Sequence, residues 1–232
     1  MTKKHEQDEL DIDKALQQEF TRAENFFNSN RKTILYVLAG LVIGVVGYVG
    51  YTEMIQKPAE QEAQTYLSVV QKQFEVDSFN LVVNGNGTDL SALDIIDDFG
   101  STKAGNLAHF YAGRSYLAMG QFEEAVDHLK SFKSDDKIVS SLAMGLAADA
   151  QSELGQHGEA ADLYMKAALN DDNAMTAPIL LKKAGLHYEK AGDFEKAVRA
   201  YTRIQEEYKE TPEFAEIVKY INRAKARGGM LD

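Results

Sequence analysis

The amino-acid sequence predicts an all-α protein in which a single N-terminal transmembrane helix precedes an α-solenoid of stacked helical hairpins. Three observations support this prediction. Residues 33–51 carry no charge and are mostly apolar, a glycine-centred pattern recurs three times between residues 117 and 201, and hydrophobic residues make up 44% of the chain. A pattern that recurs in register is typical of repeat proteins, whose units stack because one unit alone cannot bury its apolar face.

Composition excludes several classes of protein. The chain has no cysteine, so it can form neither a disulfide nor a thiolate nucleophile nor a cysteine-based metal site. Its net charge is -11, and most of this charge follows residue 32. A nucleic-acid binder needs a basic face, and a domain that lies on anionic lipid needs basic residues. We therefore expect no nucleic-acid partner.

Residues 1–32 are predicted to form a cytoplasmic tail. The stretch Glu6–Asp13 is acidic and is expected to be disordered. Apolar residues then recur with a helical period. This period predicts a short amphipathic helix that lies in the headgroup region or against the cytoplasmic face of a partner. The apolar residues concerned are Leu16, Phe20, Ala23, Phe26 and Phe27.

Residues 33–52 are predicted to cross the membrane once. As a helix, the uncharged run would span roughly 28 Å, close to a hydrocarbon core of about 30 Å. Arg31 and Lys32 precede it. Because positive charge stays cytoplasmic, the N-terminus should be inside and residues 53–232 outside. A cleaved signal peptide is the competing interpretation. The length of the run, the partly acidic tail before it and the lack of an A-x-A site all oppose it.

Three glycines lie on one face of the predicted span, namely Gly40, Gly44 and Gly47. Their spacing of four and three residues would let a second membrane helix approach closely, as in small-xxx-small packing. The alternative is that these glycines reflect only the general frequency of glycine in membrane helices.

The repeated pattern aligns three stretches without gaps: LAMGQFEEAVDHL (117–129), SELGQHGEAADLY (152–164) and EKAGDFEKAVRAY (189–201). Each stretch reads as the end of one helix, a glycine turn and the start of a second helix. The turn glycines are separated by 35 and 37 residues, close to the length of about 34 of a tetratricopeptide unit. The shared positions are the turn glycines Gly120, Gly155 and Gly192, the alanines Ala125, Ala160 and Ala197, and the first-helix residues Gly113, Ala148 and Gly185.

The pattern divides residues 53–232 into units. A degenerate unit is expected at 58–104, with Asp77 in the place of the turn glycine. In it a short helix from Leu90 to Asp98 leads to Thr102, which should cap the next helix. Clear units follow at 106–139, 141–174 and 178–211. Residues 212–227 should form the solvated cap helix of the solenoid.

No residue pattern points to catalysis, a cofactor or a bound metal, and we expect no enzyme and no small-molecule substrate. The five histidines have no metal-ligand spacing, and His109 is expected to pack in a helical pair. The loop Asn84–Asp89 has Asp89 where a calcium-binding loop requires glycine, and no glutamate closes it, so it is expected to be a connecting turn. The acids Asp97-Asp98 and Asp171-Asp172 are expected to be solvated.

A partner-binding surface is predicted on the first helices of the units, which line the concave face of such stacks. The set mixes apolar groups with charges of both signs, which suits an extended peptide or a helix of another protein. Alternatively, Phe110 and Leu186 only pack against neighbouring helices. The predicted residues are Phe110, Arg114, Leu117, Asp149, Ser152, Lys182, Leu186 and Glu189.

The order of these elements resembles the YfgM-like family of ancillary subunits of the bacterial SecYEG translocon. The resemblance rests on the tail RAENFFNSNRK, the glycine-rich span and the outward repeat domain. The phrases SALDIIDDFGSTKAGNLAHFYAGRSYLAMGQFEEAVDHL and TAPILLKKAGLHYEKAGDFEKAVRAYTRI resemble membrane-anchored repeat proteins of Bacteroidetes-type bacteria.

The resemblance implies an inner-membrane protein whose repeat domain is periplasmic and which lies beside a SecYEG-type channel. It also implies work with a membrane-anchored periplasmic chaperone of the PpiD type. The sequence hypothesis is therefore a non-enzymatic scaffold that binds this chaperone or emerging secreted chains. The alternative is an envelope assembly adaptor unrelated to Sec, serving cell division or outer-membrane export.

Overall fold

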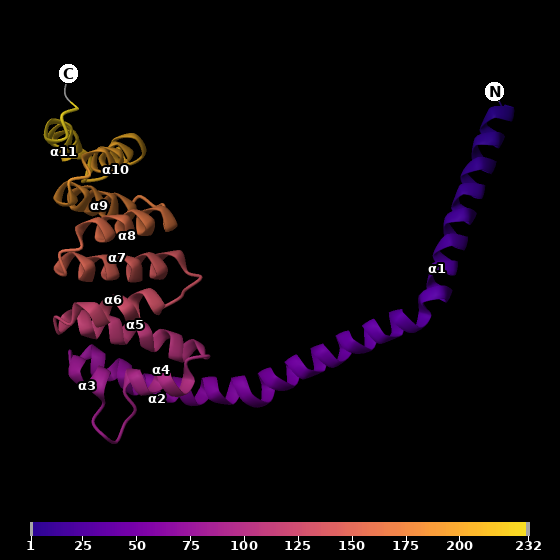
Figure 1. Ribbon diagram of the computed structural model, residues 1–232, viewed down its shortest axis with the longest axis horizontal. Coiled ribbons are helices and arrows are strands. Elements are labelled where there is room, and N and C mark those ends of the chain that lie inside the picture. The colour runs from indigo at the N-terminus through magenta and orange to yellow at the C-terminus, as the bar shows by residue number, and fades with distance from the viewer. Residues whose placement is uncertain (1, 231–232) are drawn as a thin grey trace. The chain divides into compact units, whose positions relative to one another are not determined.

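The computed structural model describes the backbone of residues 2–230 and the side chains of residues 20–22, 24–26 and 28–230. Regular structure in this part of the chain is helical throughout (Figure 1). The predicted all-α class is therefore confirmed. The chain divides into two compact units, Met1–Pro58 and Ala59–Asp232, and each is described by itself.

The first unit is dominated by helix α1, Thr2–Tyr51, which the π-helical segment η1 (Thr52–Gln56) follows directly. The expectation that Glu6–Asp13 is disordered is wrong, because this stretch lies within α1. The chain has no glycine or proline before Gly40, and its Glu, Gln, Lys and Ala residues favour a helix once the helix is nucleated.

The predicted amphipathic tail helix is thus part of α1 and not a separate element. Phe20 and Phe26 are exposed, whereas the side chains of Leu16, Ala23 and Phe27 lie outside the described residues. The role of this apolar period therefore stays a prediction.

The apolar part of α1 is long enough to cross a membrane. The helical stretch Asn28–Glu75 contains a window with a mean hydropathy of 2.1, none of which is buried. A Cβ atom added at Gly40, Gly44 or Gly47 would meet no atom within 4 Å. The glycine face is therefore open to another helix, and its use as a packing face stays a prediction.

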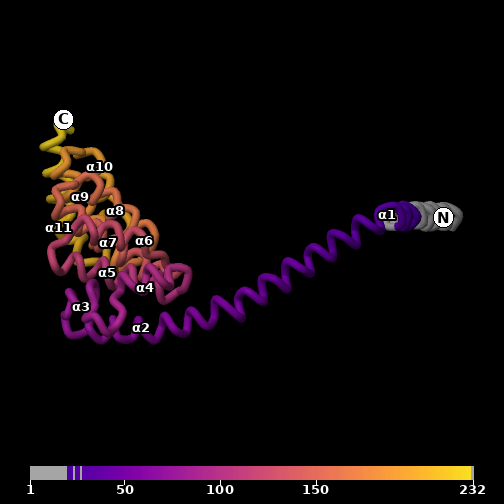
Figure 2. The backbone as a smooth tube through the Cα atoms, turned by 60° about the horizontal axis from the view of Figure 1, so that its bottom comes forward, coloured from indigo at the N-terminus to yellow at the C-terminus, as the bar shows by residue number. Residues whose placement is uncertain are grey.

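The second unit is a stack of helices in which most neighbours along the chain are neighbours in space, as Figure 1 and Figure 2 show. The bounds are α2 Lys57–Glu75, α3 Phe79–Asn84, α4 Ala92–Phe99, α5 Lys103–Ala118, α6 Phe122–Ser131, α7 Lys137–Glu153, α8 His157–Asn170, α9 Ala177–Ala191, α10 Phe194–Glu207 and α11 Phe214–Arg227.

The turn glycines adopt the left-handed conformation that a Schellman motif requires. Their φ angles are 76° at Gly120, 76° at Gly155 and 83° at Gly192. In each turn the N–H after the glycine donates to the carbonyl five residues earlier. These bonds join Gln121 to Tyr116 (2.9 Å), Gln156 to Gln151 (3.0 Å) and Asp193 to Tyr188 (2.9 Å).

The degenerate unit has the same turn. Asp77 has a φ of 56°, and the N–H of Ser78 donates to the carbonyl of Gln73 at 2.9 Å. Asp77 therefore takes the place of the turn glycine, as the alignment predicted. Aspartate is one of the few residues other than glycine that visit this conformation routinely.

The link from the degenerate unit to α5 carries two helix caps. Ser91 and Asp94 form a capping box at the start of α4. The Thr102 hydroxyl accepts from the N–H of Gly105 at 2.9 Å, which confirms the predicted cap. The Glu60 carboxylate on α2 accepts from the N–H of Lys103 at 2.6 Å, so α2 holds the positive end of α5.

Small residues bring the two helices of each hairpin together. Ala125, Ala160 and Ala197 are fully buried, as predicted. A Cβ atom at Gly113 would lie 2.7 Å from Cγ of Leu129, and one at Gly185 would lie 2.2 Å from Cε1 of Tyr201. Only glycine permits these approaches.

The cap helix α11 has the register of another first helix. It ends in the same turn, with a φ of 67° at Gly229 and a bond of 2.8 Å from the N–H of Met230 to the carbonyl of Lys225. One face buries Ile217 and Ile221. On another face, Asn222 occupies the position that Gly185 has in the preceding unit. Asn222 is exposed, so the face that carries it is solvated.

Candidate functional site

The predicted partner-binding residues come from the first helices of the three clear units. They lie ten, six or three positions before the turn glycine of their unit. We call the surface that these positions share on α5, α7 and α9 the first-helix face.

The part of this face on α5 combines packing with exposure. Phe110 and Leu117 are partly buried against the cluster formed by α6 and α7. The Phe110 ring lies 5.4 Å from that of Phe132 and 6.0 Å from that of Tyr111. Arg114 is partly exposed. Phe110 and Leu117 therefore contribute to the core while they reach the surface.

Asp149 on α7 joins three helices. Its carboxylate forms an ion pair with Lys183 of α9 at 2.7 Å and accepts a hydrogen bond from the Tyr164 hydroxyl of α8. Burial, followed by this bond to Asp149, raises the pKa of Tyr164. Ser152, one turn further on, is partly exposed.

Glu189 on α9 is 4% exposed and binds the cap helix. Arg223 donates to it at 2.5 and 3.0 Å, and Arg227 donates at 3.3 Å. The Tyr201 hydroxyl donates to it at 2.9 Å. Burial by itself would raise the pKa of Glu189, but the hydrogen bonds from Arg223 and Tyr201 outweigh it and lower that pKa. This carboxylate is thus fully engaged within the protein.

Two other residues of the face on α9 are accessible. Lys182 lies with Nζ 5.0 Å from the centre of the Tyr220 ring of α11, a cation–π distance. Leu186 is partly exposed. The structure therefore leaves Lys182 and Leu186 accessible and engages Glu189.

An apolar groove between α7 and α9 extends the first-helix face, and we call it the apolar groove. Its volume is about 250 Å³. Ile138, Leu142 and Ile179 line it and are 60%, 52% and 46% exposed. Gly145 also lines it, and a Cβ there would lie 3.4 Å from Cδ2 of Leu180. The Asp149–Lys183 pair also lines the groove.

The groove was not predicted from the sequence, because the predicted face includes no position more than ten residues before a turn glycine. Ile138 and Leu142 lie four residues apart, followed by Leu146 after another four. Such an apolar row on the exposed side of a first helix is a signal that could have identified the groove.

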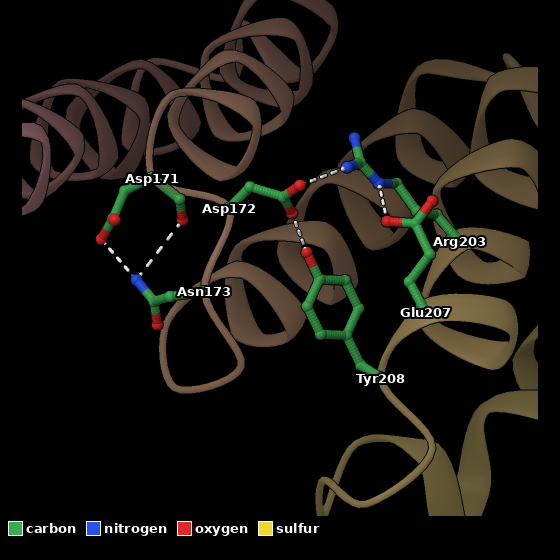
Figure 3. Close-up of polar contacts among 6 residues, drawn as sticks. All are labelled: Asp171, Asp172, Asn173, Arg203, Glu207 and Tyr208. Carbon is green, nitrogen blue, oxygen red and sulfur yellow. Dashed lines mark hydrogen bonds and ion pairs between the residues drawn. The ribbon is translucent and has the colours of Figure 1, made fainter.

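The acidic pair Asp171-Asp172 is at least partly exposed, as expected of solvated acids, and the Asp172 side chain, which is 51% exposed, also takes part in a polar network (Figure 3). Asp172 accepts from Nη2 of Arg203 at 3.0 Å and from the Tyr208 hydroxyl. Arg203 also bonds Glu207 at 2.7 Å. This network ties the link between α8 and α9 to the end of α10, so its role is to hold two hairpins together.

The loop between α3 and α4 is a connecting turn, as predicted. The side-chain oxygen of Asn86 accepts from the N–H groups of Thr88 and Asp89 at 2.9 and 2.8 Å. Within the part of the chain that the structure describes, no group of three or more acidic or histidine side chains could hold a metal ion.

Four histidines form two pairs that sequence spacing did not reveal. Nδ1 of His109 lies 3.0 Å from Nδ1 of His128, so His109 packs within a hairpin as expected. The rings of His157 and His187 lie 5.4 Å apart between α8 and α9. Tyr164 stacks on His187 at 5.4 Å.

We expect the free energy of unfolding to fall as the pH is lowered from about 6.5 towards 4. Burial, and then Lys190 and His157 nearby, lower the pKa of His187 to about 4, whereas an unfolded histidine titrates near 6.5. Between these values the unfolded chain binds a proton that the folded chain does not, so acid favours unfolding. Above pH 6.5 His187 makes its full contribution to the free energy of unfolding.

Urea unfolding of the full chain at several pH values measures this effect. His187→Gln should reduce the loss of stability between pH 6.5 and 4, while acidic groups contribute equally to both proteins. An identical pH slope in the two proteins would contradict the assignment.

The family comparison matches a model described as the tetratricopeptide repeat-like domain to residues 24–220. No curated protein gave a match. One similar crystal structure is that of a Podosopora anserina protein described as a kinesin light chain with nearly identical TPR-like repeats. It shares 16% identity, with 75% of this chain and 86% of that chain covered and a TM-score of 0.46. Since the family model matches most of the chain, the protein belongs to the tetratricopeptide repeat-like domain family.

Proposed function

We propose that the protein is a membrane-anchored scaffold that holds a segment of another protein against its first-helix face. The apolar groove carries this proposal, because three large aliphatic side chains are exposed there side by side. Exposed apolar patches on soluble domains mark interaction sites, and stacked repeats create extended binding surfaces.

The role of each residue in partner binding follows from whether its side chain is accessible or already engaged within the protein. Ile138, Leu142 and Ile179 supply apolar anchors for the partner. Arg114 and Lys182, which are partly exposed, supply charge that sets the register of the bound segment. Glu189 is excluded, since binding a partner there would require the cap helix to give up its ion pairs.

The finer proposal places this scaffold at a Sec-type protein-conducting channel in a bacterial inner membrane. The resemblance to YfgM-like subunits supports it, with α1 as the membrane anchor, the N-terminus in the cytoplasm and residues 53–232 in the periplasm. A PpiD-type chaperone or an emerging chain would occupy the groove, and Gly40, Gly44 and Gly47 would face a channel helix. An envelope adaptor unrelated to Sec is the alternative.

A photo-cross-linking amino acid at Leu142, in cells that make the full chain, tests both the binding role of the groove and the Sec assignment. We expect a protein adduct at Leu142 and much less at the matched control Leu169, which is also exposed, at 51%, but lies on the second helix α8. Channel subunits or a chaperone in the adduct would support the Sec assignment, and division or export components would support the alternative. Equal adducts at both positions would refute the proposal that the apolar groove is the binding site.

The charge-reversed variant Arg114→Glu/Lys182→Glu should reduce the Leu142 adduct. Its thermal midpoint should fall only slightly, because partly exposed charges contribute little to folding and the contact of Lys182 with Tyr220 is worth about 0.5–1 kcal/mol. Lys72→Glu/Lys209→Glu makes the same change in net charge at exposed lysines outside the face, and it should leave the adduct unchanged.

A further inference from the structure

The second helix of the first clear unit is about one turn shorter than its counterparts. Helix α6 has 10 residues, whereas α8 and α10 have 14 each. Phe132, in an extended conformation with a ψ of 135°, ends α6. The turn that α6 lacks corresponds to the part of α8 that contains Ala167 and Ala168, which are buried.

A cavity of about 490 Å³ lies between α6, α7 and α8 beside this missing turn. The apolar part of its lining, which we call the floor, includes Leu129, Phe132, Ala143 and Leu163. Met144 also lines it and is partly exposed. The volume lies within the range of about 300–1,000 Å³ that is typical of binding pockets.

The rim of this cavity is basic. Lys130, Lys133 and Lys166 line it, and all three are exposed. Nζ of Lys133 donates to the carbonyl of Lys130 at 3.0 Å. Among the ion pairs that the structure describes, none involves any of these lysines. Asp135 is the one carboxylate among the lining residues, so the lining is positive in a chain of net charge -11.

The cavity is separate from the apolar groove because it uses another face of α7. Ser140, Ala143 and Ala147 line the cavity, whereas Leu142 and Gly145 line the groove. Residues that are one or two positions apart on a helix do not face the same side. A ligand in the cavity therefore need not compete with one in the groove.

We propose that this cavity, the lysine cavity, binds an acidic segment of a partner protein. One large apolar side chain of that segment would enter the floor, and carboxylates beside it would pair with Lys130, Lys133 and Lys166. Charge complementarity indicates an acidic partner, because a positive rim in an acidic protein selects against basic and neutral segments. An apolar centre with a polar rim is also the usual anatomy of a protein interface.

A fluorescein-labelled peptide GSEDFEDGS provides the probe, with the full chain held in nanodiscs of zwitterionic lipid. Fluorescence anisotropy at low salt should show saturable binding that weakens as salt is raised. Lys130→Glu/Lys166→Glu should weaken binding at least tenfold. The control Lys72→Glu/Lys209→Glu has the same net charge and should bind like the parent. The peptide GSEDSEDGS, which lacks the aromatic ring, should bind at least tenfold more weakly than GSEDFEDGS.

Three results would overturn the proposal. Equal loss of binding in both charge-reversed variants would show a diffuse attraction and no site. Equal affinity for the two peptides would show that the apolar floor is not used. The absence of saturable binding to the parent at millimolar peptide would exclude an acidic partner segment. The first-helix face plays no part in this test, so its outcome is separate from that of the photo-cross-linking.

Discussion

Gly185→Ala is expected to destabilise the protein by about 1–3 kcal/mol, the usual cost of forcing an extra carbon into a packed core. The added Cβ would lie 2.2, 2.5 and 2.7 Å from three atoms of the Tyr201 ring. That ring cannot move aside easily, because Tyr201 is fully buried and its hydroxyl is bonded to Glu189. The clash should outweigh the helix propensity gained by replacing glycine.

Gly145→Ala is the matched control, since it makes the same change inside another first helix. Its Cβ would meet Leu180 at an ordinary contact distance of 3.4 Å. Here the gain in helix propensity should dominate and raise stability by about 0.5–1 kcal/mol. Chemical denaturation of both variants measures the difference. Gly185→Ala being as stable as Gly145→Ala would show that the hairpin of α9 and α10 packs more loosely than described.

Glu189→Ala is expected to lower the free energy of unfolding by about 1–3 kcal/mol, the cost of leaving a buried hydrogen-bonding group without its partner. The change removes the acceptor of the buried Tyr201 hydroxyl. It also removes the partner of Arg223 and Arg227, which are 39% and 57% exposed and can therefore be hydrated instead. The loss should stay below that for a fully buried ion pair.

Hydrogen exchange can locate the effect of Glu189→Ala. Amides of α11 should exchange faster in the variant, while those of α5 should be unchanged, because Glu189 joins α9 to α11 only at the end of the stack. Tyr201→Phe alone should cost less, since it removes the hydroxyl and leaves the ion pairs. Uniform acceleration across the domain would mean that the cap helix does not open separately.

Features of single hairpins could be predicted from the sequence because the repeats supply internal copies for comparison. The left-handed turn at Gly155 and the burial of Ala160 follow from residues that recur at the same place in each unit. Even Asp77 was identifiable, since its neighbours align with those of the turn glycines. These are local features, set within about ten residues of the turn.

Contacts between hairpins were harder to predict. Three ion pairs join residues 34 positions apart, namely Lys183–Asp149, Lys196–Asp162 and Arg223–Glu189. Charges at such separations look solvated in the sequence. Glu189 was predicted on the binding surface from its position on a first helix, and that position does not reveal its ion pairs with α11. The acidic Glu6–Asp13 stretch was misjudged for a different reason, since its charge hid its good helix propensity.

The packing of each hairpin on the next also bears on how the chain can fold during its synthesis. A hairpin meets its main partners about one repeat length later, as the three ion pairs spaced by 34 residues show. Contacts between residues that are close in sequence give rapid folding, and order in such arrays spreads from one unit to the next. The solenoid can therefore grow in step with translation, each new hairpin docking on a surface that the previous one has already completed.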